Sequence, residues 1–296
     1  MSNFKLNESY ILSNQDWTFP TNIAYGPGRL KEIGKICNNL DIKNPLIVTD
    51  KGSPKLPFVK NLQSYLANSN VKSDLFFDIS PNPREDEVSV GCKKYKDGKH
   101  DSIIAIGGGS AMDGGKLICL TANNDVPLRD FEFELTPPKI SKDNPFPKII
   151  TIPTTAGTGA ETEITAMVTY LKEGMKFCMW HPDVRPSLAL IDPELTIGLP
   201  STLTAWTGAD ALIHAIEGYC VPGFNPMCDG AALEGLSLIS KSLIKAVEEP
   251  KNILARGGMH VGSCLAGISF LKGLGNVHSI SHMAVSYTHL TLPTKA

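Results

Sequence analysis

The stretch SIIAIGGGSAMDGGK, residues 102–116, joins a short apolar run to a glycine turn and then to a helical pattern. Glycine lets the backbone approach a ligand closely, and the first turn of a helix offers free N–H groups at the positive end of its dipole. These properties suit a pyrophosphate group. The spacing is not G-x-G-x-x-G, however, so a tight turn closed by a Ser110-x-x-Asp113 capping box explains the stretch equally well.

A second glycine-rich strand end, TIPTTAGTGAE at 151–161, favours the nucleotide interpretation. Two such loops at the carboxyl ends of parallel strands lie along one edge of a sheet, where ligands bind. The hydroxyls of Thr154, Thr155 and Thr158 can each bond to ribose or phosphate. Asp50 ends the strand pattern LIVTD, and an acid there can accept both ribose hydroxyls and would favour NAD over NADP. A plain turn aspartate is the alternative.

Around these loops, short β-branched runs alternate with helical patterns, which predicts an α/β fold with a doubly wound parallel sheet. The predicted strands lie within 44–50, 73–80, 101–110 and 148–159, and the predicted helices within 55–69, 84–98 and 111–123. Residues 162–180 alternate around Lys-Glu-Gly, which predicts a hairpin appended to that sheet.

The pattern changes near Pro193, after which three helical patterns follow with no strand between them. We therefore predict a dinucleotide-binding α/β domain at 1–192 and an all-helical domain at 193–285.

The helical half carries two pairs of candidate metal ligands. Asp210 and His214 are four residues apart, as are His278 and His282, so each pair lies on one face of a helix. A carboxylate with imidazoles suits Fe²⁺ or Zn²⁺. Surface or capping pairs share this spacing, but both pairs following a nucleotide-like half favour a metal-plus-dinucleotide site. Glu217, one turn beyond His214, either orients that histidine or is a solvated helix residue, and the latter is favoured.

The composition is that of a soluble globular protein, with 42% hydrophobic and 20% charged residues over 296 positions. A formal net charge of −2 gives no reason to expect nucleic acid or an anionic membrane as partner. No secretory signal or membrane-length apolar run is present. Seven scattered cysteines without C-x-x-C indicate reduced thiols. We expect a cytoplasmic protein.

Taken in order, these motifs resemble the iron-containing alcohol dehydrogenase family. The matching stretches are LIVTDKG, the Pro-Asn-Pro at 81–83, IAIGGGSAMDGGK, IPTTAGTGAETE, IDPELTIGLP, TAWTGADALIHAIEGY and GLGNVHSISH. They run from Tyr25 to about Met283, nearly the whole chain. The family pairs a dinucleotide domain with a helical metal domain, and its active site lies in the cleft between them.

The resemblance implies three metal ligands, Asp210, His214 and His278, and an active-site histidine, His282, which would relay a proton. It also implies cofactor contacts at Asp50, Asn82, Gly108, Gly109, Ser110, Asp113, Thr154, Thr155, Lys176 and Thr196. Members interconvert small alcohols and aldehydes or ketones with NAD(H), often as homo-oligomers. A divalent metal, Fe²⁺ with Zn²⁺ as the alternative, polarises the substrate oxygen for hydride transfer.

The chain departs from the family after His278. The family's fourth ligand is a histidine in a motif ending His-Gly, which is absent here. The end of the chain, VSYTHLTLPTKA, has no helical period and looks like an adapter-derived tail, so we expect residues 286–296 to be foreign and assign no role to His289. Two alternatives therefore stay open: an inactive, truncated NAD-binding fragment, or a related NAD- and metal-dependent enzyme such as a polyol dehydrogenase.

Overall fold

A seven-stranded sheet forms the centre of the first half of the computed structural model, which describes residues 12, 15–18, 21–222, 225–273 and 275–282. The expected foreign tail, including His289, lies outside the described residues. In sheet order the strands are β1 (Gln15–Thr18), β2 (Asn22–Tyr25), β9 (Leu188–Ile191), β6 (Lys148–Pro153), β5 (Ser102–Gly107), β3 (Pro45–Asp50) and β4 (Asp74–Ile79). All neighbouring pairs except β1–β2 are parallel, which confirms the predicted parallel sheet. The short strands β1, β2 and β9 were not predicted.

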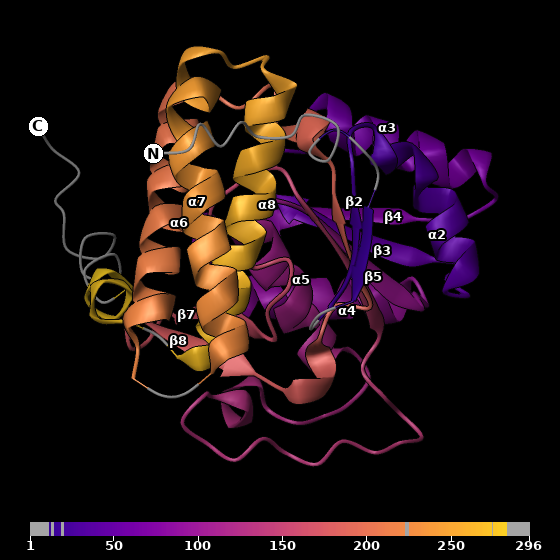
Figure 1. The fold of residues 1–296 in the computed structure, drawn as a ribbon. Helices are drawn as coiled ribbons and strands as arrows, with labels where there is room; N and C mark the ends of the chain where they lie inside the picture. The colour runs from indigo at the N-terminus through magenta and orange to yellow at the C-terminus, as the bar shows by residue number, and fades with distance from the viewer. Residues whose placement is uncertain (1–11, 13–14, 19–20, 223–224, 274, 283–296) are drawn as a thin grey trace, which may run out of the picture.

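Helices cover both faces of this sheet (Figure 1). They are α2 (Ile33–Asn39) and α3 (Pro57–Asn68) on one face, and α4 (Glu85–Asp97) and α5 (Gly109–Ala122) on the other. Ile47 and Ile104 pack in the core beneath α2 and α3, whereas their chain neighbours Leu46 and Ile103 pack in the core beneath α4 and α5. Successive strand residues thus point to opposite faces, and both faces are buried, as the doubly wound prediction requires.

Three long helices make up the second half and confirm its predicted helical character. They are α6 (Ser201–Cys220), α7 (Pro226–Glu248) and α8 (Ile253–Ser269), and they pack beside the sheet (Figure 1). Ala189 and Ile191 of β9 share a buried cluster with Leu238 of α7 and Cys264 of α8, while Leu190 faces the opposite core. The helices therefore cover the part of the α4–α5 face that those two helices leave open.

The predicted hairpin exists, but its predicted attachment to the main sheet is wrong. Strands β7 (Thr165–Tyr170) and β8 (Met175–Trp180) form a separate two-stranded sheet that does not pair with the seven-stranded sheet. Isolated bridges link Thr169 to Arg84 and Met179 to Glu132. Val168 and Met179 lie in the buried cluster that contains α5 residue Leu117, so side-chain packing replaces a backbone ladder as the attachment.

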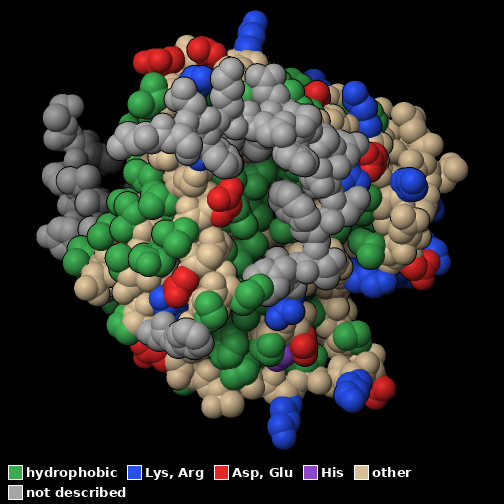
Figure 2. Space-filling view, viewed as in Figure 1, with side chains coloured by type: hydrophobic (Ala, Val, Ile, Leu, Met, Phe, Trp, Pro, Cys, Tyr) green, Lys and Arg blue, Asp and Glu red, His purple; other side chains and the backbone are tan. Residues whose placement is uncertain are grey.

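Apolar side chains are exposed over the helices of the second half (Figure 2). The large ones on α6 and α7 are Leu203, Trp206, Ile216, Tyr219, Met227, Leu233 and Ile244. A concentration of this kind marks a surface suited to contact with further protein. None of the helices in the described part of the chain has the length and hydropathy of a membrane span.

The loop that follows β6 joins the two halves by close backbone packing. Gly159 has φ of +68°, and a Cβ added there would lie 2.5 Å from the Cα of Gly267 in α8. A Cβ on Gly157 would lie 2.9 Å from the carbonyl oxygen of Thr207 in α6. These two glycines therefore let the loop fit against the helices.

We predict that Gly159→Ala destabilises the protein by about 2–4 kcal/mol, because it combines a strained φ with overlap against backbone that cannot move aside. Gly230→Ala is the matched control: it lies inside α7 with no atom within 4 Å of the added Cβ. That change should stabilise by about 0.5–1 kcal/mol. Urea unfolding followed by circular dichroism measures both, and equal effects would contradict the packing role of Gly159.

Candidate active site

One face of α6 carries the polar groups of the candidate site. Asp210, His214 and Glu217 are spaced i, i+4 and i+7, so they form a single stripe along the helix. His214 and Glu217 are buried, and Asp210 is half-buried. A second helical segment, residues 276–282, brings His278 and His282 to the same place.

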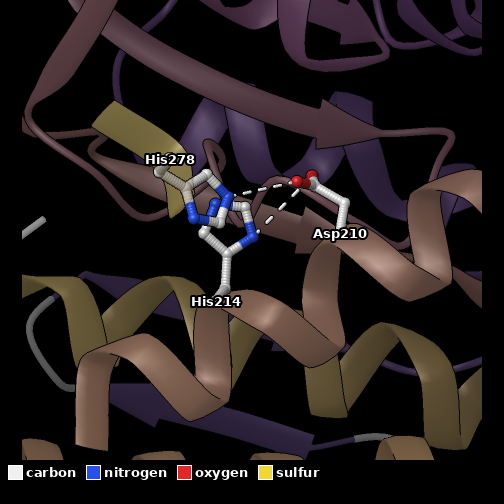
Figure 3. A group of neighbouring side chains, drawn as sticks. All are labelled: Asp210, His214 and His278. Atoms are coloured by element: carbon white, nitrogen blue, oxygen red, sulfur yellow. Dashed lines mark hydrogen bonds and ion pairs between the residues drawn. The ribbon is translucent and has the colours of Figure 1, made fainter. Parts of the chain in front are cut away.

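Asp210, His214 and His278 converge from these two segments (Figure 3). One ligand atom from each lies within 4.8 Å of the others. The His278 Nε2 is 3.2 Å from the Asp210 Oδ1, and the His214 Nδ1 is 3.7 Å from the Asp210 Oδ2. The two imidazole rings stack with centroids 4.0 Å apart and planes at 25°. The structure thus brings together the three residues that the sequence singled out as ligands.

The chemistry of this cluster fits a divalent metal. The Nδ1 of His214 is buried and has no hydrogen-bond partner in the described part of the chain, an arrangement that costs roughly 1–3 kcal/mol unless something binds there. Burial lowers the pKa of His214 to about 4, so its imidazole is neutral at pH 7 and can act as a ligand. A carboxylate with two imidazoles suits Fe²⁺ or Zn²⁺.

Glu217 contacts His278, which corrects the interpretation of this residue. It is 8% exposed, so the favoured view of a solvated helix residue is wrong. Its carboxylate hydrogen-bonds the Nδ1 of His278, whereas the alternative view had paired it with His214. Burial alone would lower the pKa of His278, but hydrogen bonds to Asp210 and Glu217 raise it above its ordinary value.

An aromatic wall, absent from the predictions, closes one side of the cluster. Phe270 sets its ring edge-on against His214, with centroids 4.5 Å apart, and against His278, with centroids 5.1 Å apart. Such edge-to-face packing holds both imidazoles in place and keeps water from their faces. Nothing in the local sequence distinguishes Phe270 from an ordinary core residue.

His282 lies beside the ligand cluster and is not part of it. Its ring centroid is 6.3 Å from that of His278, one helical turn away. Burial lowers the pKa of His282, and the nearby positive charge of Lys176 on β8 lowers it further. Lys176 itself has a pKa lowered by burial, although the charge of Asp113 opposes this. The structure therefore brings Lys176 of the hairpin towards the histidines.

Glu163, which the sequence did not single out, also faces this region. It is half-buried, and burial raises its pKa to about 7. Its Oε2 accepts a hydrogen bond of 3.0 Å from the hydroxyl of Thr165, and its carboxyl interacts electrostatically with His278. The sequence GAETE gave no reason to prefer this glutamate over its neighbour.

The glycine turn between β5 and α5 begins the helix that carries Asp113, whose charge acts on Lys176. Helix α5 has Gly108 as its N-cap and no side-chain cap, so the alternative interpretation of this stretch as a capping box is wrong. The hydroxyl of Ser110 donates to the carbonyl of Pro81, and Asp113 accepts a hydrogen bond from the backbone of Met167. An α-helix start without a side-chain cap is suited to bind an anion.

The remaining predicted cofactor residues gather along the carboxyl edge of the sheet. The N–H of Thr154 donates to the carbonyl of Gly107 at 2.9 Å, which ties the two glycine-rich loops together. A Cβ added to Gly108 would lie 3.6 Å from the Thr155 side chain, and a Cβ added to Gly107 would lie 3.1 Å from the Asp50 carboxylate.

Three predicted cofactor residues have local roles or positions of their own. Asp50 accepts hydrogen bonds from the N–H of Gly52 at 2.9 Å and the hydroxyl of Ser53 at 2.8 Å. Asn82 is half-buried and follows Pro81, the partner of Ser110. Thr196 is buried, and its hydroxyl donates to the carbonyl of Pro193 at 2.9 Å.

A doubly wound sheet with a glycine turn at its carboxyl edge, joined to helices that hold a carboxylate–histidine cluster, is an arrangement suited to an oxidoreductase. The sequence pattern of the family "Iron-containing alcohol dehydrogenase" matches residues 20–193, and that of "Fe-containing alcohol dehydrogenase family, C-terminal" matches residues 204–291. The chain belongs to the iron-containing alcohol dehydrogenase family and is an oxidoreductase that acts on alcohols.

Individual relatives agree with this assignment. Alcohol dehydrogenase 4 of Saccharomyces cerevisiae is 35% identical over 267 residues, which cover 90% of this chain and 69% of the yeast protein. A solved 1,3-propanediol oxidoreductase is 32% identical with a TM-score of 0.86, covering 95% of this chain and 72% of that one. Sulfoacetaldehyde reductase from Bifidobacterium kashiwanohense, solved with NAD⁺, is 32% identical with a TM-score of 0.81 and covers 94% and 71%.

We predict that His278→Ala lowers Zn²⁺ affinity by about 100-fold or more, since it removes one of the three ligands together with its hydrogen bond to Glu217. His282→Ala should change the affinity by less than about threefold, because that ring lies outside the cluster. Competition against a coloured chelator measures both. Equal losses in the two variants would show that the metal binds elsewhere.

Proposed function

We propose that the chain is an NAD(H)-dependent alcohol dehydrogenase and aldehyde reductase that uses Fe²⁺. The observation that carries this proposal is the convergence of Asp210, His214 and His278, with a buried imidazole nitrogen that lacks a partner, in a chain that also presents an uncapped glycine turn for a dinucleotide. The domain limits that we propose are 1–192 for the cofactor half and 193–285 for the metal half.

The chain's own residues would bind the metal and NAD and would accept the substrate proton. Asp210, His214 and His278 would hold the metal, which when bound supplies a Lewis acid for the substrate oxygen. NAD would lie with its pyrophosphate at Gly108, Gly109 and Ser110 and supplies the hydride chemistry.

His282 is the group best suited to move the substrate proton. Its lowered pKa leaves the imidazole neutral at pH 7 and able to accept a proton, and Lys176 beside it disfavours the charged form. Phe270 shields the two ligand imidazoles from water.

A preference for NAD over NADP is part of the proposal. Asp50 places a carboxylate at the end of β3, beside the glycine turn, where it can accept ribose hydroxyls and repel a 2′-phosphate. The NAD⁺ bound in the solved sulfoacetaldehyde reductase supports NAD as the cofactor. The name of the 1,3-propanediol oxidoreductase supports a small alcohol or diol as substrate.

A second candidate is an NAD-binding protein without turnover. Among the described residues, the cluster contains three protein ligands, which is one fewer than the four that the family resemblance implies. Catalytic metal sites with three protein ligands are common, however, and leave a position open for substrate. Three protein ligands therefore allow metal binding and turnover, and the experiment below separates the two candidates.

The experiment removes the metal with a chelator and then adds Fe²⁺ back. With NAD⁺ and 1,3-propanediol, we expect NADH formation at 340 nm that is lost after chelation under anaerobic conditions and restored by Fe²⁺. NADP⁺ should support a rate at least about tenfold lower, since one uncompensated like-charge contact costs about 1.4 kcal/mol or more. NAD⁺ binding without metal-dependent NADH formation would favour the inactive alternative.

A further inference from the structure

We propose that Glu217 is a positioning residue that makes His278 a competent ligand: its carboxylate selects the tautomer of the imidazole and caps the helical segment that carries it. This inference rests on the proposed metal site and assigns the residue that orients the ligand His278. The role is distinct from that of Asp210, His214 and His278, which would touch the metal directly.

Three contacts join Glu217 to this segment. Its Oε2 bonds to the Nδ1 of His278 and also accepts the backbone N–H of His278 at 3.1 Å. Its Oε1 accepts the backbone N–H of Val277 at 2.6 Å. One carboxylate on α6 therefore holds a residue 61 positions away by both its backbone and its side chain.

The tautomer follows from what each atom can do. An ionised carboxylate only accepts hydrogen bonds, so the Nδ1 of His278 must donate. A neutral imidazole with its proton on Nδ1 has a lone pair on Nε2, and this Nε2 faces the Asp210 Oδ1 at 3.2 Å. Without a metal this contact is held by a proton between Nε2 and Asp210, and a metal would take the place of that proton, so Glu217 leaves Nε2 as the nitrogen that binds the metal.

The cap follows from the start of the helical segment at Asn276. The first N–H groups of a helix have no partner within it, and Glu217 accepts two of them while placing its negative charge at the positive end of the dipole. Gly275 permits this approach, because a Cβ there would collide with the Glu217 side chain. His278 and His282 thus reach the site on a segment tethered directly to α6.

Glu217→Gln separates the two roles because it keeps the shape of the side chain. With its nitrogen in place of Oε2, the amide donates to the His278 Nδ1 and its oxygen still accepts the N–H of Val277, while the N–H of His278 loses its acceptor. The proton moves to Nε2, which can no longer bind a metal. We expect Zn²⁺ affinity of the full chain to fall about 10- to 100-fold, with the melting temperature little changed.

The direct readout is the tautomer of His278 in metal-free protein, by ¹⁵N–¹H NMR with labelled histidine at a pH where the ring is neutral. We expect a proton on Nδ1 in the unaltered chain and on Nε2 in Glu217→Gln. Glu234→Gln, an exposed change on α7, is the control and should alter neither the tautomer nor the affinity.

A proton on Nε2 in the unaltered chain, or unchanged Zn²⁺ affinity in Glu217→Gln, would overturn the proposal. Neither readout depends on catalysis. If the unaltered chain binds Zn²⁺ with the expected tautomer but oxidises no alcohol, the proposed function fails while the role of Glu217 stands.

Discussion

The backbone contact between Gly159 and Gly267 determines how the two halves of this protein meet. A Cβ on either residue would lie within 2.6 Å of backbone atoms of the other, so the cofactor-side loop and α8 pack with no side chain between them. The same loop begins at Thr154, whose N–H bonds to Gly107 in the first glycine turn. One loop therefore connects the glycine turn at the edge of the sheet to the helices that carry the histidine cluster.

Helix α6, which packs against that loop, carries ionisable groups whose burial would be unfavourable without partners. Removing a carboxylate or an imidazolium from water is costly unless partners compensate. Asp210 and Glu217 both bond to His278, and Phe270 packs against the rings of His214 and His278. Within this cluster, one buried nitrogen, the Nδ1 of His214, has no hydrogen-bond partner among the described residues. This vacancy in the hydrogen-bond pattern is what a metal ion would fill.

Local patterns account for what could be predicted from the sequence. The strand and helix periods reveal the parallel sheet and the helical half, and the i, i+4 spacing reveals Asp210, His214, His278 and His282, because both are properties of neighbouring residues. The contact of Glu217 with His278 spans 61 positions, so local patterns do not predict it. The only local indication is that Glu217 lies at i+7 from Asp210 on the same helix face. The hairpin was assigned to the wrong sheet because an alternating pattern predicts a strand but does not say which sheet it joins. The capping-box interpretation of Ser110 is wrong because its hydroxyl donates to the carbonyl of Pro81, 29 positions away in the chain.

The central claim is that α6 and the segment at 276–282 form one metal site between them. Anomalous X-ray diffraction from crystals grown with Fe²⁺ or Zn²⁺, recorded on both sides of the absorption edge of the metal, tests this claim most directly. We expect a single strong peak in contact with the Asp210 carboxylate and with nitrogens of His214 and His278, with the Glu217 carboxylate behind His278. A metal-loaded crystal whose peak lies away from these three side chains would contradict it.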